Sequence, residues 1–158
     1  FSQDPGTLIG VEQDLYPIVG LPFVASAQIA VWKGQDLDTG VWRSLERHVG
    51  LVRLVDSLSG EVVLCAPLGD TASMVDQELS KSGITALTWQ RGYSLLSVIG
   101  KQSALAEIEA NVYLTLNRNA IQPLYRESTD CRATYVVPEQ QSRTALLVVY
   151  DQVRAYLD

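Results

Sequence analysis

The chain has 158 residues, of which 47% are hydrophobic and 19% are charged, and 18 acidic against 12 basic residues give a net charge of −6. This composition is typical of a folded globular protein, and the length suffices for one ordinary domain or two small ones. The acidic balance argues against nonspecific binding to nucleic acid or anionic membranes, which depends on an excess of Lys and Arg. A single histidine, His48, with two cysteines leaves little for a zinc site, so we expect no metal and no cofactor.

Neither a membrane span nor a secretory signal is predicted. The longest apolar run, 21–32, is broken by polar residues and is shorter than the roughly 20 residues of a membrane helix, and no basic segment followed by an apolar one opens the chain. Because the chain starts at Phe1 and its methionine is Met74, we expect it to be part of a longer protein. Cys65 and Cys131 lie in apolar, strand-like runs and are predicted to be buried, reduced thiols of a cytoplasmic protein.

In chain order, the first segments are a connector and an isolated strand. Residues 1–16 contain the turn signal Pro5-Gly6 and are expected to form the connector. Residues 17–24 are apolar but contain Pro17 and Pro22, which confines such a segment to an edge strand or to the start of a strand.

Residues 25–91 are predicted to form a first unit. Val41, Leu45 and Val49 recur at a spacing of four, which indicates one face of a helix, and Asp70 is a candidate N-cap. The expected elements are a strand over 28–32, a helix over 41–49, strands over 51–55 and 61–66, a helix over 71–81 and a closing strand over 84–89.

Residues 92–158 are predicted to form a second unit. Its last helix is expected to bury Leu146, Tyr150, Val153 and Leu157, which are spaced i, i+4, i+7 and i+11. The expected elements are a strand over 93–99, a helix over 103–118, a strand over 120–125, a turn over 127–130, a strand over 132–137 and a helix over 139–156.

Both units therefore share the order strand, helix, strand, strand, helix. This order predicts an α+β fold that contains two ferredoxin-like βαββαβ units in tandem, with antiparallel sheets and helices on one face. The second unit ends without a closing strand. We expect the strand over 17–24 to complete its sheet, since strands that pair need not be neighbours in sequence.

Four segments carry a family resemblance that spans nearly the whole chain. They are PGTLIG at 5–10, IVGLPFVASAQIAVWKG at 18–34, LERHVGLVRLVDSLSGEVVLCAP at 45–67 and NAIQPLYRESTDCRATYVVP at 119–138. In this order and spacing they resemble the tandem ACT domains of the C-terminal regulatory region of aspartokinases.

The resemblance implies a regulatory module that binds a small amino acid, lysine or threonine, for allosteric feedback control of aspartate-family amino-acid biosynthesis. It implies an upstream kinase domain, to which residues 1–16 would connect, and a homodimer that forms through the ACT sheets. The kinase chemistry would lie in that upstream domain, so this chain by itself is not expected to be an enzyme.

In such units the loop between a strand and a helix offers backbone N–H groups at the helix N-terminus, which suits a carboxylate. The facing strand and turn would contact the amino group and the side chain of the effector. The effector-binding candidates are Gln35, Asp36, Leu37, Asp38, Thr39, Gly40, Val52, Arg53, Asp56 and Ser57 in the first unit, and Lys101, Gln102, Ser103, Arg126, Glu127 and Ser128 in the second.

Two arginines depart from the family pattern. Arg53 stands where lysine-sensing members have Asp, and Arg126 stands where the second unit has an effector-contacting Gln. A guanidinium would repel an amino group, which leaves Asp56 as the acid that could pair with an ammonium. The alternative is an assembly module of the same fold with a degenerate site that senses nothing. A standalone enzyme is disfavoured, because the sequence shows no catalytic constellation and no nucleotide-binding motif.

Overall fold

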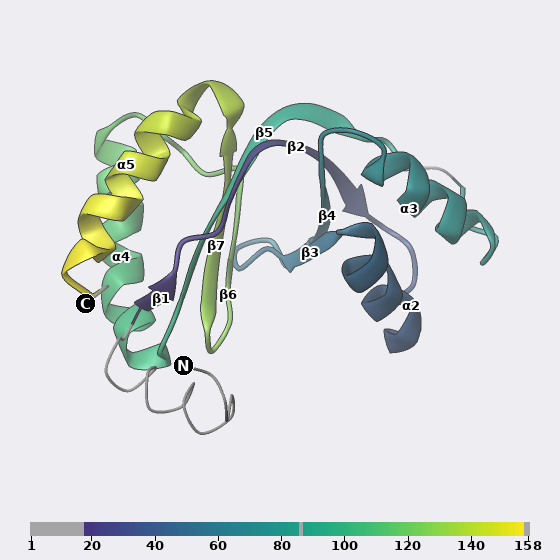
Figure 1. The fold of residues 1–158 in the computed structure, drawn as a ribbon, viewed down its shortest axis with the longest axis horizontal. Helices are drawn as coiled ribbons and strands as arrows, with labels where there is room; N and C mark the ends of the chain where they lie inside the picture. Colours follow the sequence, from purple (N-terminus) through teal and green to yellow (C-terminus); the bar gives the residue numbers. More distant parts are fainter. Residues whose placement is uncertain (1–17, 86, 157–158) are drawn as a thin grey trace, which may run out of the picture.

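The computed structural model describes residues 18–85 and 87–156 (Figure 1). The expected connector over 1–16 lies outside the described residues. Within them, the strands form an antiparallel sheet in the order β3-β4-β2-β5-β7-β6, with β1 paired to β5. No helix in the described part of the chain is both long enough and apolar enough to cross a membrane.

The helices and strands follow the predicted order except between α3 and β5, where no separate strand is present in the described residues. The strands are β1 (Ile18–Gly20), β2 (Phe23–Trp32), β3 (Val52–Val55), β4 (Val62–Pro67), β5 (Gln90–Gly100), β6 (Tyr125–Ser128) and β7 (Arg132–Pro138). The helices are α2 (Thr39–Ser44), which continues into the π-helical turn η1 (Leu45–Val49), α3 (Thr71–Ser80), α4 (Gln102–Arg118) and α5 (Ser142–Val153), with short 3-10 turns η2 (Glu139–Gln141) and η3 (Arg154–Tyr156) on either side of α5.

Two ferredoxin-like units share strands in this sheet. β5 pairs with β2, as the closing strand of the first unit would, and also with β7, as the first strand of the second unit would. β1 and the start of β2 both lie beside β5, with Ile18 opposite Gly100 and Phe23 opposite Leu96. The α+β fold of tandem ACT-like units is thus confirmed, but its two sheets are continuous. The proposed boundary between residues 91 and 92 falls inside β5 and stays a prediction.

The predicted closing strand over 84–89 is wrong. Residues 84–85 and 87–89, the described part of this segment, have no strand structure, and β5 takes the place beside β2 that the segment would have filled. Asp76 of α3 holds the segment instead, because its carboxylate accepts hydrogen bonds from the backbone N–H of Leu87 and from the indole N–H of Trp89, each at 3.2 Å. Hydrogen bonds to the side chain of Asp76 thus hold this segment in place of hydrogen bonds to a neighbouring strand.

The second strand of the second unit begins later than predicted. The segment 120–124 is irregular, although Ile121 and Pro123 are buried, and the strand occupies Tyr125–Ser128, where a turn was expected to begin. The turn follows at Thr129, whose backbone N–H donates to the carbonyl oxygen of Arg132 at 2.8 Å. The apolar residues that predicted a strand here are thus buried in an irregular segment, which joins β7 through the backbone N–H of Leu124, a donor to the carbonyl oxygen of Val136 at 2.7 Å.

The last helix buries only part of the face that was predicted, including Val153. Ala145, Val149 and Val153 are buried, whereas Tyr150 is 47% exposed and Leu146 is only partly buried. The small Ala145 allows α5 to pack close to α4 and the sheet. Leu157, also predicted on the buried face, lies outside the described residues.

Three apolar clusters hold the sheet and helices together. One lies between β5, β7 and the pair α4 and α5. Another lies between β2, β4 and the helical segments α2, η1 and α3, so each helix pair covers one outer face (Figure 1). The third contains Ile29 and Val63 of the first unit and Leu95 and Val136 of the second. The sheet therefore bends so that its two helix-free faces share a core, in which burial of each large side chain contributes about 1.5–3 kcal/mol.

Asp56 connects the two edge strands of the bent sheet. It follows β3 and is 6% exposed, and its carboxylate accepts a hydrogen bond from the backbone N–H of Arg126 in β6 at 2.9 Å. It also accepts from the backbone N–H and the hydroxyl of Ser59, at 2.9 and 2.8 Å. The backbone N–H of Ser57 donates to the carbonyl oxygen of Arg126 at 2.8 Å. The turn after β3 is thereby attached to the second unit.

Glu127 makes the reciprocal contact from β6. Its carboxylate accepts a hydrogen bond from the backbone N–H of Val55 at 2.8 Å and lies 3.7 Å from the guanidinium of Arg132. Each unit thus supplies one acid that binds a backbone N–H of the other, and these contacts close the open edges of the sheet.

Replacement of Asp56 by Asn should destabilise the protein in a pH-dependent way. Burial raises the pKa of Asp56, but the hydrogen bonds from Arg126, Ser59 and Leu58 outweigh burial and hold this pKa below its ordinary value of 3.8. Because an amide offers fewer acceptor sites, Asp56→Asn should lower the free energy of unfolding at pH 7 by about 1–3 kcal/mol. The wild-type advantage is complete above the unfolded-state pKa and is lost as pH falls through the lower folded-state pKa.

Urea unfolding at pH 7 and at pH 3 measures this difference. The two proteins should differ at pH 7, and the difference should be smaller at pH 3. Asp130→Asn, at an exposed turn position, is the control and should change stability by less than about 0.5 kcal/mol. Equal stability of Asp56→Asn and the wild type at pH 7 would contradict the role of Asp56.

The two cysteines should differ in reactivity. Cys65 is buried in β4, whereas Cys131 is exposed just before β7, so the prediction of two buried thiols is wrong for Cys131. Burial, with a smaller contribution from Glu127, raises the pKa of Cys65 to about 12, and the thiolate is the reactive form. Ellman's reagent should therefore modify one thiol in the native protein and both in urea. Cys131→Ser should abolish the native reaction, and a native reaction of both thiols would contradict the burial of Cys65.

Candidate functional site

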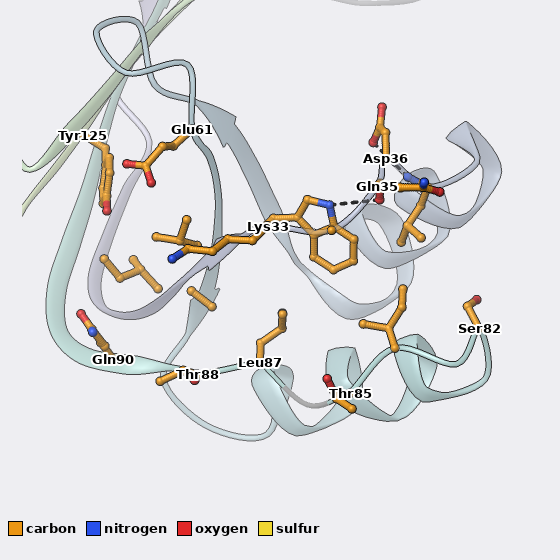
Figure 2. Close-up of a pocket in the computed structure, with 17 residues that line it drawn as sticks. Lys33, Gln35, Asp36, Glu61, Ser82, Thr85, Leu87, Thr88, Gln90 and Tyr125 are labelled. Carbon is orange, nitrogen blue, oxygen red and sulfur yellow. Dashed lines mark hydrogen bonds between the residues drawn. The ribbon is translucent and has the colours of Figure 1, made fainter.

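A cavity of about 820 Å³ opens where β2 ends and the chain turns toward α2 (Figure 2). Its walls come from the end of β2 and the loop after it, from the segment that connects α3 to β5, from the residue before β4, and from β6 of the second unit. The lining residues are Ile29, Ala30, Val31, Trp32, Lys33, Gly34, Gln35, Asp36, Leu37, Glu61, Ser82, Ile84, Thr85, Leu87, Thr88, Gln90 and Tyr125.

The loop beside the cavity is held by hydrogen bonds to two backbone carbonyl oxygens, those of Gln35 and Asp38. Trp32, the last residue of β2, is buried, and its indole N–H donates to the carbonyl oxygen of Gln35 at 3.2 Å. The carbonyl oxygen of Asp38 accepts from the backbone N–H groups of Val41 and Trp42, which starts α2. Five residues thus separate the strand from the helix cap, and the loop between them forms one wall of the cavity.

Asp36 is the centre of a charged cluster at one end of the cavity. One of its carboxylate oxygens accepts hydrogen bonds from the indole N–H of Trp42 at 2.7 Å and from the backbone N–H of Leu37 at 3.0 Å. The guanidinium of Arg53 lies 3.6 Å from the same oxygen, 3.8 Å from the carboxylate of Glu46 and 4.7 Å from the Trp42 ring centroid. The guanidinium of Arg53 is therefore shared between the carboxylates of Asp36 and Glu46 at this end.

A different set of polar groups lies at the opposite end. Figure 2 shows the side chain of Lys33 extending along the cavity toward the region where Glu61, Gln90 and Tyr125 lie. Burial raises the pKa of Tyr125, and the negative charge of Glu61 raises it further, which indicates that this phenol and carboxylate are neighbours. The ends of the cavity thus differ in charge pattern.

The structure brings only part of the first predicted set to the cavity. Gln35, Asp36 and Leu37 line it. Asp38, Thr39 and Gly40 lie beyond the cavity, at the start of α2. Val52 packs in the core shared by both units, and Arg53 contacts Asp36. Asp56 and Ser57 belong to the edge contact with β6.

The second predicted set lies elsewhere and is divided between two places. Lys101, Gln102 and Ser103 are exposed at the start of α4, after the end of β5 opposite to Gln90, which lines the cavity. In β6, the guanidinium of Arg126 lies 4.0 Å from the Tyr113 ring centroid, beside a groove of about 460 Å³. Glu127 makes the edge contact with Val55. The hydroxyl of Ser128 donates a hydrogen bond to the carboxylate of Glu109 in α4. These six residues do not form one site.

Among the polar residues of the cavity that were not predicted from the sequence are Lys33, Glu61, Gln90 and Tyr125. They come from four different strands or strand ends, and Tyr125 belongs to the other unit. Only Lys33, adjacent to the predicted loop, gave a local signal. In the part of the chain that the structure describes, no group of three His, Cys, Asp or Glu residues could hold a metal ion.

The adjacent carboxylates Asp36 and Asp38 should contribute unequally to stability. Asp36→Ala removes the acceptor for Trp42 and Leu37, so we expect a loss of about 1–2 kcal/mol in the free energy of unfolding. Asp38→Ala is the matched control, because the Asp38 side chain makes no cap hydrogen bond to α2. Urea titrations followed by tryptophan fluorescence measure both, and equal losses would contradict the cluster.

No family profile and no curated protein matches this sequence, but solved structures do. The regulatory subunit of aspartate kinase from Thermus thermophilus is 13% identical, with a TM-score of 0.57 over 85% of this chain and 98% of that chain. A structure of aspartokinase alpha and beta subunits gives 15% identity and a TM-score of 0.58, with 87% of this chain and 99% of that chain covered. The aspartate kinase from Synechocystis is 16% identical, with a TM-score of 0.61 over 88% of this chain and 27% of that chain.

These similarities are structural and extend over nearly the whole chain. The chain matches about a quarter of the length of the Synechocystis kinase, but almost the whole length of the separate Thermus thermophilus regulatory subunit. The resemblance predicted from the sequence is therefore confirmed at the level of the fold. The chain has the fold of the regulatory region of aspartate kinases, with two ACT-like units joined in one sheet.

Proposed function

We propose that this chain is the regulatory module of an aspartokinase-like enzyme and that it binds a small amino acid in the cavity beside the loop 33–37. The bound effector would control an attached or associated aspartate kinase in aspartate-family amino-acid biosynthesis by shifting it between states. The observation that supports this most is the composition of the cavity wall, which joins the loop leading into α2 to Tyr125 of the second unit.

This arrangement offers a physical route from ligand to conformation. Tyr125 is adjacent in β6 to Arg126, whose backbone N–H binds Asp56 at the edge contact. A ligand that packs on Tyr125 and on the loop would therefore contact both units close to the place where they are joined. Its binding free energy could favour one relative arrangement of the units over another.

An assembly module is the second candidate, and the Asp36 cluster favours it. Arg53 stands in β3 at a position that contacts the effector in the family resembled, yet its guanidinium is already paired with Asp36 and Glu46. In this alternative the chain forms a homodimer through its ACT sheets and holds kinase domains together without sensing an amino acid.

A thermal-shift screen of the twenty amino acids separates the two candidates. A ligand that binds only the native state at 100 times its Kd stabilises it by about 2.7 kcal/mol, which for a chain of this length should raise the melting temperature by several degrees. A dose-dependent rise for one amino acid, or a small group of them, is the result expected of a sensor.

Sedimentation velocity on the same samples tests the alternative. The assembly candidate predicts about twice the monomer mass of 17.3 kDa together with no thermal shift for any amino acid. That combination would contradict the sensing role.

A further inference from the structure

One cation and one anion at the polar end of the cavity have no partner among residues 18–85 and 87–156. The ammonium of Lys33 and the carboxylate of Glu61 make no hydrogen bond or ion pair with these residues, and the two groups are not within ion-pair distance of each other. Figure 2 shows Lys33 extending toward the end of the cavity where Glu61 and Tyr125 lie. Opposite charges therefore lie at one end of the cavity with space between them.

We propose that this end binds the head group of an α-amino acid, with its carboxylate at Lys33 and its ammonium at Glu61. This inference rests on the proposed function and assigns the recognition chemistry to its site. A zwitterion suits this pair, since its two charges would each gain a charge-assisted contact. Tyr125 and Gln90 border the same region and offer a hydroxyl and an amide for further hydrogen bonds.

The other end of the cavity decides which side chain the ligand carries. Its walls include the apolar side chains of Leu37, Ile84 and Leu87. The acid there, Asp36, already accepts hydrogen bonds from Trp42 and Leu37 and lies 3.6 Å from Arg53. A second ammonium, such as that of lysine, would have to share Asp36 with Arg53 and would lie near that guanidinium. The ligand class is therefore an amino acid with an uncharged, largely apolar side chain.

L-Norleucine and L-lysine provide a matched test, because norleucine is lysine without its terminal amino group. Isothermal titration calorimetry on this chain should show L-norleucine binding at least about tenfold more tightly than L-lysine, the size of loss expected when a charge is left unpaired. L-Norleucinamide, which lacks the carboxylate, and N-acetyl-L-norleucine, which lacks the ammonium, should each bind at least about tenfold more weakly than L-norleucine.

Two substitutions test the residues. Lys33→Met and Glu61→Gln should each raise the Kd of L-norleucine by about 10–100-fold. Both residues are exposed, so their melting temperatures without ligand should match that of the wild type. Lys81→Met and Glu78→Gln are the controls, since this exposed pair, 2.9 Å apart, does not line the cavity, and their Kd values should be unchanged.

The outcomes distinguish this inference from the proposed function. If L-lysine binds as tightly as L-norleucine, or if Lys33→Met and Glu61→Gln bind an amino acid with wild-type affinity, the inference is wrong while an amino-acid site still exists. If L-norleucine and the twenty standard amino acids all leave the melting temperature unchanged, the proposed function itself fails, and the inference fails with it.

Discussion

The antiparallel pairing of β5 with β2 is the constraint on which the rest of the structure depends. β5 pairs with β2 on one edge and with β7 on the other, so the same strand belongs to both units. A strand presents two hydrogen-bonding edges, and here both edges are used within the chain. The sharing explains how two units fit into a chain of this length. It also fixes how the two helix pairs lie, on opposite outer sides of one bent sheet (Figure 1).

Bending the sheet has two consequences for function. It brings the edge strands β3 and β6 together, where Asp56 and Glu127 bind backbone N–H groups across the junction. It also places Tyr125 of the second unit in the wall of a cavity whose other walls belong to the first. The cavity and the junction are therefore neighbours along β6, which connects the proposed amino-acid site to the contact between the units.

Local pattern predicted most of the helices and strands, because periodicity reports which residues face a core. The helix expected over 103–118 corresponds to α4, whose apolar residues Leu105, Ile108, Val112 and Leu116 are all buried. The same reasoning was wrong for 84–89 and for the exposed face of α5. Apolar residues can be buried against a side chain such as Asp76, as well as in a sheet, and periodicity does not distinguish these cases. Of the site, the sequence predicted the loop before α2 and missed Glu61, Gln90 and Tyr125.

The sequence by itself determined the order of the elements, the repeat of a βαββα pattern and the absence of a nucleotide-binding motif, because each of these depends on neighbours along the chain. The tertiary structure decided which strands pair, that one strand serves two units, and which charges are already satisfied. Arg53 illustrates the difference: its charge is evident from sequence, but only the fold shows that Asp36, Glu46 and Trp42 surround it. Contacts between distant segments arise from packing, and packing is a property of the whole chain.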